Sequence, residues 1–116
     1  MEKIITVEGK DLKFKATGAT PIFYKNKFGD DMLVDIASLT QGFDQKNQTM
    51  PPQLIEKFGK IAYIMHKQGD PEQPDDWIEW LDQFEMFSIV EILPQIMELW
   101  ALNNKQTSVP KKETAR

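Results

Sequence analysis

The stretch between residues 88 and 102 constrains the fold more than any other part of this chain. It reads SIVEILPQIMELWAL, and its only charged or amide side chains are Glu91, Gln95 and Glu98. At 100° per residue these three fall on one narrow line of an α-helix, so most of the remaining circumference is apolar. A helix of this kind has to be covered by its own chain, by a second chain, or by both.

The length of the chain limits how much apolar surface it can bury. At 116 residues, with 41% hydrophobic and 28% charged residues, it is long enough for one globular domain with a single core. No apolar run approaches the roughly 20 residues of a membrane-spanning helix, and residues 1–7 lack the pattern of a signal peptide. The absence of cysteine fits a reducing compartment. We therefore expect a cytoplasmic protein without a membrane-spanning segment.

Charge is distributed unevenly along the chain. No Lys or Arg occurs between Lys67 and Lys105, where nine acidic residues lie: Asp70, Glu72, Asp75, Asp76, Glu79, Asp82, Glu85, Glu91 and Glu98. Nucleic-acid binding requires a basic face that neutralises phosphates, and here the most aromatic region is also the most acidic. The pattern argues against a nucleic-acid partner. It fits either a solvated face or a surface that attracts basic partners.

Apolar and polar residues alternate at the start of the chain, which predicts a short β-hairpin. Its turn lies at residues 8–11, and its buried face consists of Ile5, Val7, Leu12, Phe14 and Ala16. Thr20 as N-cap and Pro21 as first helical residue then predict a short helix that ends near Gly29. Asp30 or Asp31 is expected to cap a second helix, which ends at Gly42 and whose apolar residues are Met32, Leu33, Ile36 and Leu39.

Three more helices are predicted beyond a polar loop at residues 42–49. Pro51 and Pro52 open the first, and the sequence Gly-Asp-Pro at residues 69–71 ends it. Asp75 or Asp76 caps the next. Ser88 and Glu91 form a capping box for the last, in which Pro94 predicts a kink. The expected fold class is mainly α (α+β): a short N-terminal β-hairpin followed by a bundle of about four to five short helices. Residues 1–103 form the single domain, and residues 104–116 form a flexible basic tail.

Residues suited to catalysis are scarce. His66 is the only histidine, there is no thiol, and no serine lies in a nucleophile motif. The single glycines form no phosphate-binding loop. Carboxylates such as Asp30 with Asp35, or Asp75 with Asp76 and Glu79, are the remaining candidates for a metal-dependent hydrolase, but acidic residues at helix starts already serve as caps. The prediction is a protein that is not an enzyme, with no catalytic, cofactor-binding or metal site.

Binding to another protein explains more of the pattern. Large apolar side chains recur at helical spacing after residue 76, and simple core packing is one explanation for them. The other is a surface for a partner or for a second copy of the chain, since aromatic residues and methionine are enriched at interface centres. The candidate partner-binding residues are Trp77, Trp80, Phe84, Phe87, Met97 and Trp100.

Three segments, in this order after a short hairpin, resemble the tail assembly chaperones of long-tailed (siphovirus-type) phages or prophages of Gram-positive bacteria. They are FGDDML at residues 28–33, PDDWIEWL at residues 74–81 and ILPQIMELW at residues 92–100, followed by a tail at residues 107–112. The likeness extends over nearly the whole chain. It consists of loose patterns without an invariant catalytic signature.

The resemblance implies a non-enzymatic assembly factor in the host cytoplasm that is absent from the mature virion. Its members bind the tape-measure protein, keep it soluble and assist polymerisation of the tail tube. The resemblance also implies a longer form, made by a programmed frameshift, that recruits the tail-tube protein. A homo-oligomer is expected, with part of the apolar surface of residues 88–102 facing a second chain. The alternative function is a small acidic regulatory protein of the antitoxin or anti-activator type.

Overall fold

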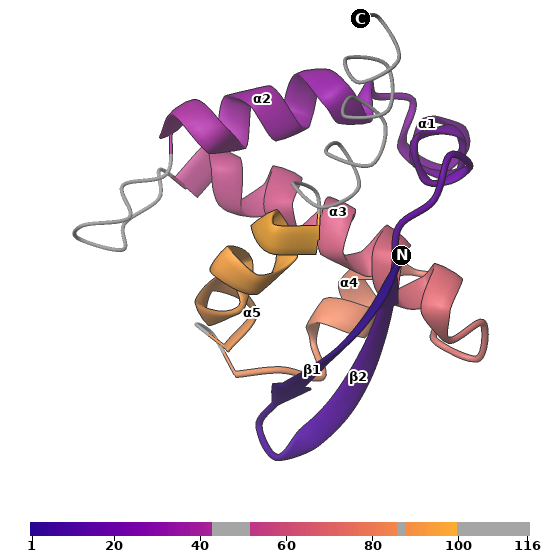
Figure 1. Ribbon diagram of the computed structural model, residues 1–116, viewed down its shortest axis with the longest axis vertical. Helices are drawn as coiled ribbons and strands as arrows, with labels where there is room; N and C mark the ends of the chain where they lie inside the picture. The colour runs from indigo at the N-terminus through magenta and orange to yellow at the C-terminus, as the bar shows by residue number, and fades with distance from the viewer. Residues whose placement is uncertain (43–51, 86–87, 100–116) are drawn as a thin grey trace, which may run out of the picture.

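The computed structural model describes residues 1–42, 52–85 and 88–99. Two strands, β1 (Glu2–Val7) and β2 (Lys10–Lys15), are followed by helices α1 (Thr20–Phe28), α2 (Met32–Gly42), α3 (Pro52–Gly69), α4 (Trp77–Leu81) and α5 (Ser88–Glu91) (Figure 1). Residues 93–99 form a further helical segment. The predicted mainly α fold with an N-terminal hairpin is confirmed. Most of the predicted polar loop and the predicted tail at 104–116 lie outside the described residues.

The hairpin pairs β1 and β2 in antiparallel register, from Glu2 opposite Lys15 to Val7 opposite Lys10. Its turn residues Glu8 and Gly9 both have positive φ, 54° and 79°, as a tight two-residue turn between twisted strands requires. The buried face is the predicted one, because Ile5, Val7, Leu12, Phe14 and Ala16 are all at most 9% exposed. This apolar face of the hairpin packs against the helices.

Helix α3 is the central element of the fold. It contacts β2, α1, α2, α4 and α5, and it passes through the middle of the molecule, with α2 on one side and the hairpin on another (Figure 1). Residues 61–66 are all buried, so in this part the helix is covered on every side.

Helix ends follow local signals in most places. Gly29, with φ of 77°, ends α1, as predicted. The carboxylate of Asp31 accepts hydrogen bonds from the backbone N–H groups of Leu33 and Val34, and that of Asp76 accepts one from Ile78. Thr20 differs from its predicted role, because it is the first residue of α1 and Ala19 is the N-cap residue. Its hydroxyl accepts a bond from the Thr17 N–H and donates one to Gln68.

The start of the last helix is fixed by the hairpin. The Glu8 carboxylate accepts hydrogen bonds from the Glu85 N–H at 2.5 Å and from the Ser88 hydroxyl at 2.6 Å. These two bonds lower the pKa of Glu8 below its ordinary value. Ser88 does begin α5 as predicted, but its hydroxyl donates to the hairpin turn. The helix is interrupted at residue 92, just ahead of Pro94, where a break in the hydrogen-bonding ladder was expected.

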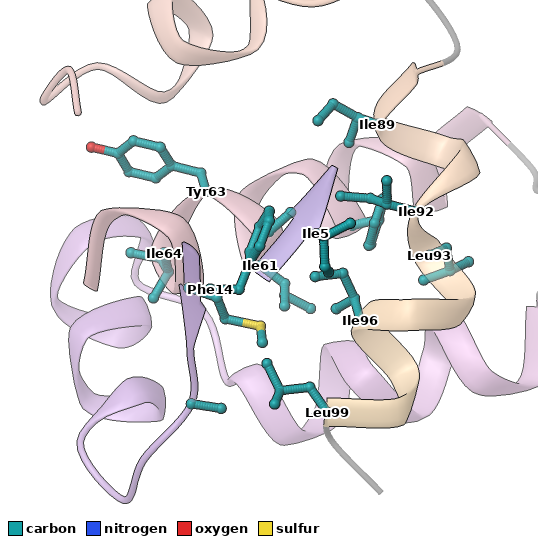
Figure 2. Packing of buried hydrophobic residues seen from close by; sticks show 14 of the residues in the cluster. Ile5, Phe14, Ile61, Tyr63, Ile64, Ile89, Ile92, Leu93, Ile96 and Leu99 are labelled. Carbon is teal, nitrogen blue, oxygen red and sulfur yellow. The ribbon is translucent and has the colours of Figure 1, made fainter. Parts of the chain in front are cut away.

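Most of the described apolar residues of the last helix are covered by the chain itself. Val90 and Met97 are half-buried and residues 100–102 lie outside the described part, so the expectation that part of this helix faces a second chain stays a prediction. Ile89, Ile92, Leu93, Ile96 and Leu99 are all at most 4% exposed. In Figure 2, Ile92, Ile96 and Leu99 extend from the helical segment towards the region of Ile5 in β1. The hairpin and α3 together cover more of the apolar surface of the last helix than was expected from short elements.

Candidate functional site

The residues predicted to bind a partner do not form one exposed surface. Trp80 is fully buried, and its indole N–H donates a 2.9 Å hydrogen bond to Nδ1 of His66. Its ring also packs edge-on against Tyr63 and Phe84, with centroids 5.6 and 5.1 Å apart. In this fold Trp80 therefore offers no surface to a partner, and it acts as a core residue.

The other predicted residues are divided between half-buried positions and undescribed ones. Trp77, Phe84 and Met97 are half-buried and pack against the core from outside. Phe87 and Trp100 lie outside the described residues. A partner-binding role for Trp77, Phe84 and Met97 stays a prediction.

Exposed apolar side chains are concentrated on a different part of the molecule. Four of them belong to α1 and α2: Ile22 at 60% exposed, Phe23 at 46%, Leu33 at 65% and Val34 at 59%. We call these four residues the α1–α2 surface. Single exposed apolar residues are ordinary, whereas several on adjoining helices mark a candidate contact surface.

Two hollows flank α1. Ile22 and Leu33 both line a depression of about 320 Å³ at the junction of α1 and α2. Phe23 lines a larger cavity of about 550 Å³ between α1, α3 and the segment after α3. The exposed side of α1 is therefore a ridge between two hollows, a shape that can contact a helix or an extended segment of another protein.

A buried ionic network holds the helices that carry this surface. Asp35 of α2 is 4% exposed, and its carboxylate accepts a 2.6 Å bond from the Tyr24 hydroxyl of α1 and a 3.0 Å bond from Lys57 of α3. Burial and this carboxylate raise the pKa of Tyr24 far above its ordinary value. The hydrogen bond and charge of Asp35 likewise raise the pKa of Lys57. The network fixes the relative placement of α1, α2 and α3.

This network determines which face of α2 points inwards. Of the apolar residues named for this helix, Met32 and Leu39 are buried and Ile36 is half-buried, but Leu33 is one of the most exposed apolar residues. Asp35 is turned inwards because two partners distant in sequence satisfy its charge. The sequence did contain a signal for these exposed residues, namely the adjacent apolar pairs Ile22–Phe23 and Leu33–Val34. Neighbouring residues on a helix lie about 100° apart, so a narrow buried face seldom covers both members of a pair.

His66 makes stability depend on pH. Burial lowers its pKa below the ordinary value of 6.5, and it lies between Phe14 and Trp80, while Asp70 opposes the shift. Well above pH 6.5 the imidazole is neutral in both the folded and the unfolded chain. As the pH falls below 6.5 the unfolded chain takes up the proton first, so the free energy of unfolding decreases, by at most about 1.4 kcal/mol per pH unit.

Urea unfolding between pH 7.5 and 5.0 measures this effect. The wild-type protein should lose stability over that range, and His66→Phe, which retains an aromatic ring beside Phe14, should have a shallower dependence. Equal slopes in the two proteins would show that His66 does not carry the effect.

No protein family, curated protein or solved structure matches this chain in comparisons with known proteins. Within residues 1–42, 52–85 and 88–99, no group of three or more His, Cys, Asp or Glu side chains could hold a metal ion. In the same part of the chain no helix is both long and apolar enough to cross a membrane.

Proposed function

We propose that this protein is a tail assembly chaperone that binds the tape-measure protein of a long-tailed phage or prophage, keeps it soluble and assists tail-tube polymerisation. The likeness of residues 28–33, 74–81 and 92–100 to such chaperones suggests the class. The observation that carries the binding role is the exposed α1–α2 surface, in which Ile22 and Leu33 line one hollow and Phe23 lines the other.

The chemistry of the client accounts for this surface. A tape-measure protein is a long helical chain with apolar stripes, and an apolar stripe can be shielded by a hydrophobic ridge with adjoining hollows. Acidic side chains around α4 are exposed, among them Asp75, Asp76, Glu79 and Asp82. With the overall charge of −4, they would keep a complex of chaperone and client in solution.

The proposal extends to the wider assembly. A longer frameshifted form would bring in the tail-tube protein, and several copies of the short form would coat one client. The site of action is the host cytoplasm during assembly, with the chaperone absent from the finished virion.

Co-expression tests the function directly. The tape-measure protein encoded beside this gene should be found in the pellet when expressed alone, and largely in the soluble fraction, bound to this protein, when the two are made together. A client that stays in the pellet at equal expression levels would contradict the proposal. A neighbouring toxin or transcription regulator that forms a complex in its place would favour the regulatory alternative.

A further inference from the structure

The larger cavity beside α1 has a chemistry of its own. Its wall is mostly apolar and includes Phe23, Tyr63, Ile64 and Pro71, and Lys27, Lys67 and Asp75 also line it. Its volume of about 550 Å³ falls in the range of cavities that hold small molecules or anchoring side chains. Among the charged residues that line it, Lys27 and Lys67 face a single anion, Asp75, while the charge of Asp76 also reaches Tyr63 in its wall.

The two lysines have different partners. Lys67 Nζ donates to the carbonyl oxygens of Pro71 and Gln73, at 2.8 and 2.5 Å, and pairs with the Asp75 carboxylate at 3.1 Å. These contacts take all three of its N–H groups. They also lower the pKa of Asp75, so that carboxylate stays ionised.

Lys27 has capacity for a ligand. Its Nζ donates to the backbone carbonyl of Asp75 and lies 5.8 Å from the centre of the Tyr63 ring. The charge of Lys27 also acts on the nearby Asp75 carboxylate, but that carboxylate forms its ion pair with Lys67. An ammonium group has three donors, so Lys27 can still donate to a ligand. The Tyr63 hydroxyl is itself held by a 2.6 Å bond to the Pro74 carbonyl, so the cavity wall beside Lys27 is fixed in place.

We propose that this cavity anchors the client by taking an apolar side chain that has a carboxylate beside it, as in a leucine or phenylalanine next to an aspartate or glutamate. The apolar part would rest among Phe23, Ile64 and Pro71, and the carboxylate would pair with Lys27. This inference rests on the proposed function, because it assigns the anchoring chemistry of the same ridge. The ammonium group of Lys27 favours an acidic segment of the client over a basic one.

Small probes test the cavity without the client. We would titrate ¹⁵N-labelled protein with 4-phenylbutyrate and with its neutral amide, and follow the amide signals of Asn26, Ile64 and Gln68, which line the cavity. The acid should shift these signals and bind roughly three- to fivefold more tightly than the amide, as an exposed ion pair allows. Absence of shifts at these residues, or equal affinity of the acid and the amide, would overturn the proposal.

Matched lysine variants connect the cavity to the client. Lys27→Met should abolish the preference for the acid and lower the soluble fraction of the co-expressed tape-measure protein. Lys10→Met, at an exposed position of the hairpin that lines neither hollow, should change neither. If the wild-type protein solubilises the client and Lys27→Met does so equally well, the anchor is wrong and the function stands. If the wild-type protein itself fails, the function and its client are wrong whatever the probes do.

Discussion

Trp80→Ala should cost about 3–5 kcal/mol of unfolding free energy, the range for removing a large buried aromatic side chain. The variant loses ring contacts with Tyr63, His66 and Phe84, and it leaves the buried Nδ1 of His66 without its donor. Because a domain of this size has a total stability of only about 5–15 kcal/mol, a substantial fraction of the variant could be unfolded at 37 °C. Urea titration followed by circular dichroism measures the change.

Two companion variants separate packing from general damage to α4. Trp80→Phe keeps most of the ring contacts and loses the bond to His66, so an intermediate loss of about 1–3 kcal/mol is expected. Ile78→Ala removes a side chain that is 51% exposed two residues away, and should stay within about 0.5 kcal/mol of wild type. Trp80→Ala with near wild-type stability would place this tryptophan on a binding surface, as the sequence pattern first indicated.

Ile96→Asp should also be strongly destabilising, by several kcal/mol, because it introduces a carboxylate at a position with 0% exposure. Gln95→Asp introduces the same group at the neighbouring half-buried position and should cost about 1 kcal/mol or less. Thermal unfolding and size-exclusion chromatography of the three proteins compare stability and association. A stable Ile96→Asp variant that loses self-association would mean that this face of the helix is a subunit interface after all.

The two predictions concern the elements for which sequence reasoning was least complete. The hairpin follows from alternating apolar residues, the end of α1 from Gly29, and two helix starts from the caps Asp31 and Asp76. These signals depend on neighbouring residues, so the features were predictable from the sequence. The central position of α3 had a signal in the unbroken apolar run at residues 61–65, but no central helix was predicted from it. The extent to which α3 and the last helix are each buried depends on how the hairpin packs against them. That packing is decided by contacts between residues distant in sequence.

The candidate site was predictable only in part. A surface for another protein was expected, but the aromatic residues chosen for it include the buried Trp80, and the exposed residues of α1 and α2 were not chosen. Helical period could not reveal that Asp35 is buried, because Tyr24 and Lys57, which satisfy its charge, lie 11 and 22 residues away. Once Asp35 is turned inwards, Leu33 and Val34 are left on the outside.

The most direct test of the proposed function compares the binding of the tape-measure protein by two matched double variants. Ile22→Asp with Leu33→Asp changes the α1–α2 surface at one shared hollow. Ile4→Asp with Ile78→Asp changes two exposed isoleucines on the hairpin and α4, at 56% and 51% exposure. Affinity for the tape-measure protein, measured with both variants folded, should fall at least about tenfold for the first pair and remain near wild type for the second. Equal binding by the two pairs, or loss confined to the second, would contradict the assignment of the client to α1 and α2.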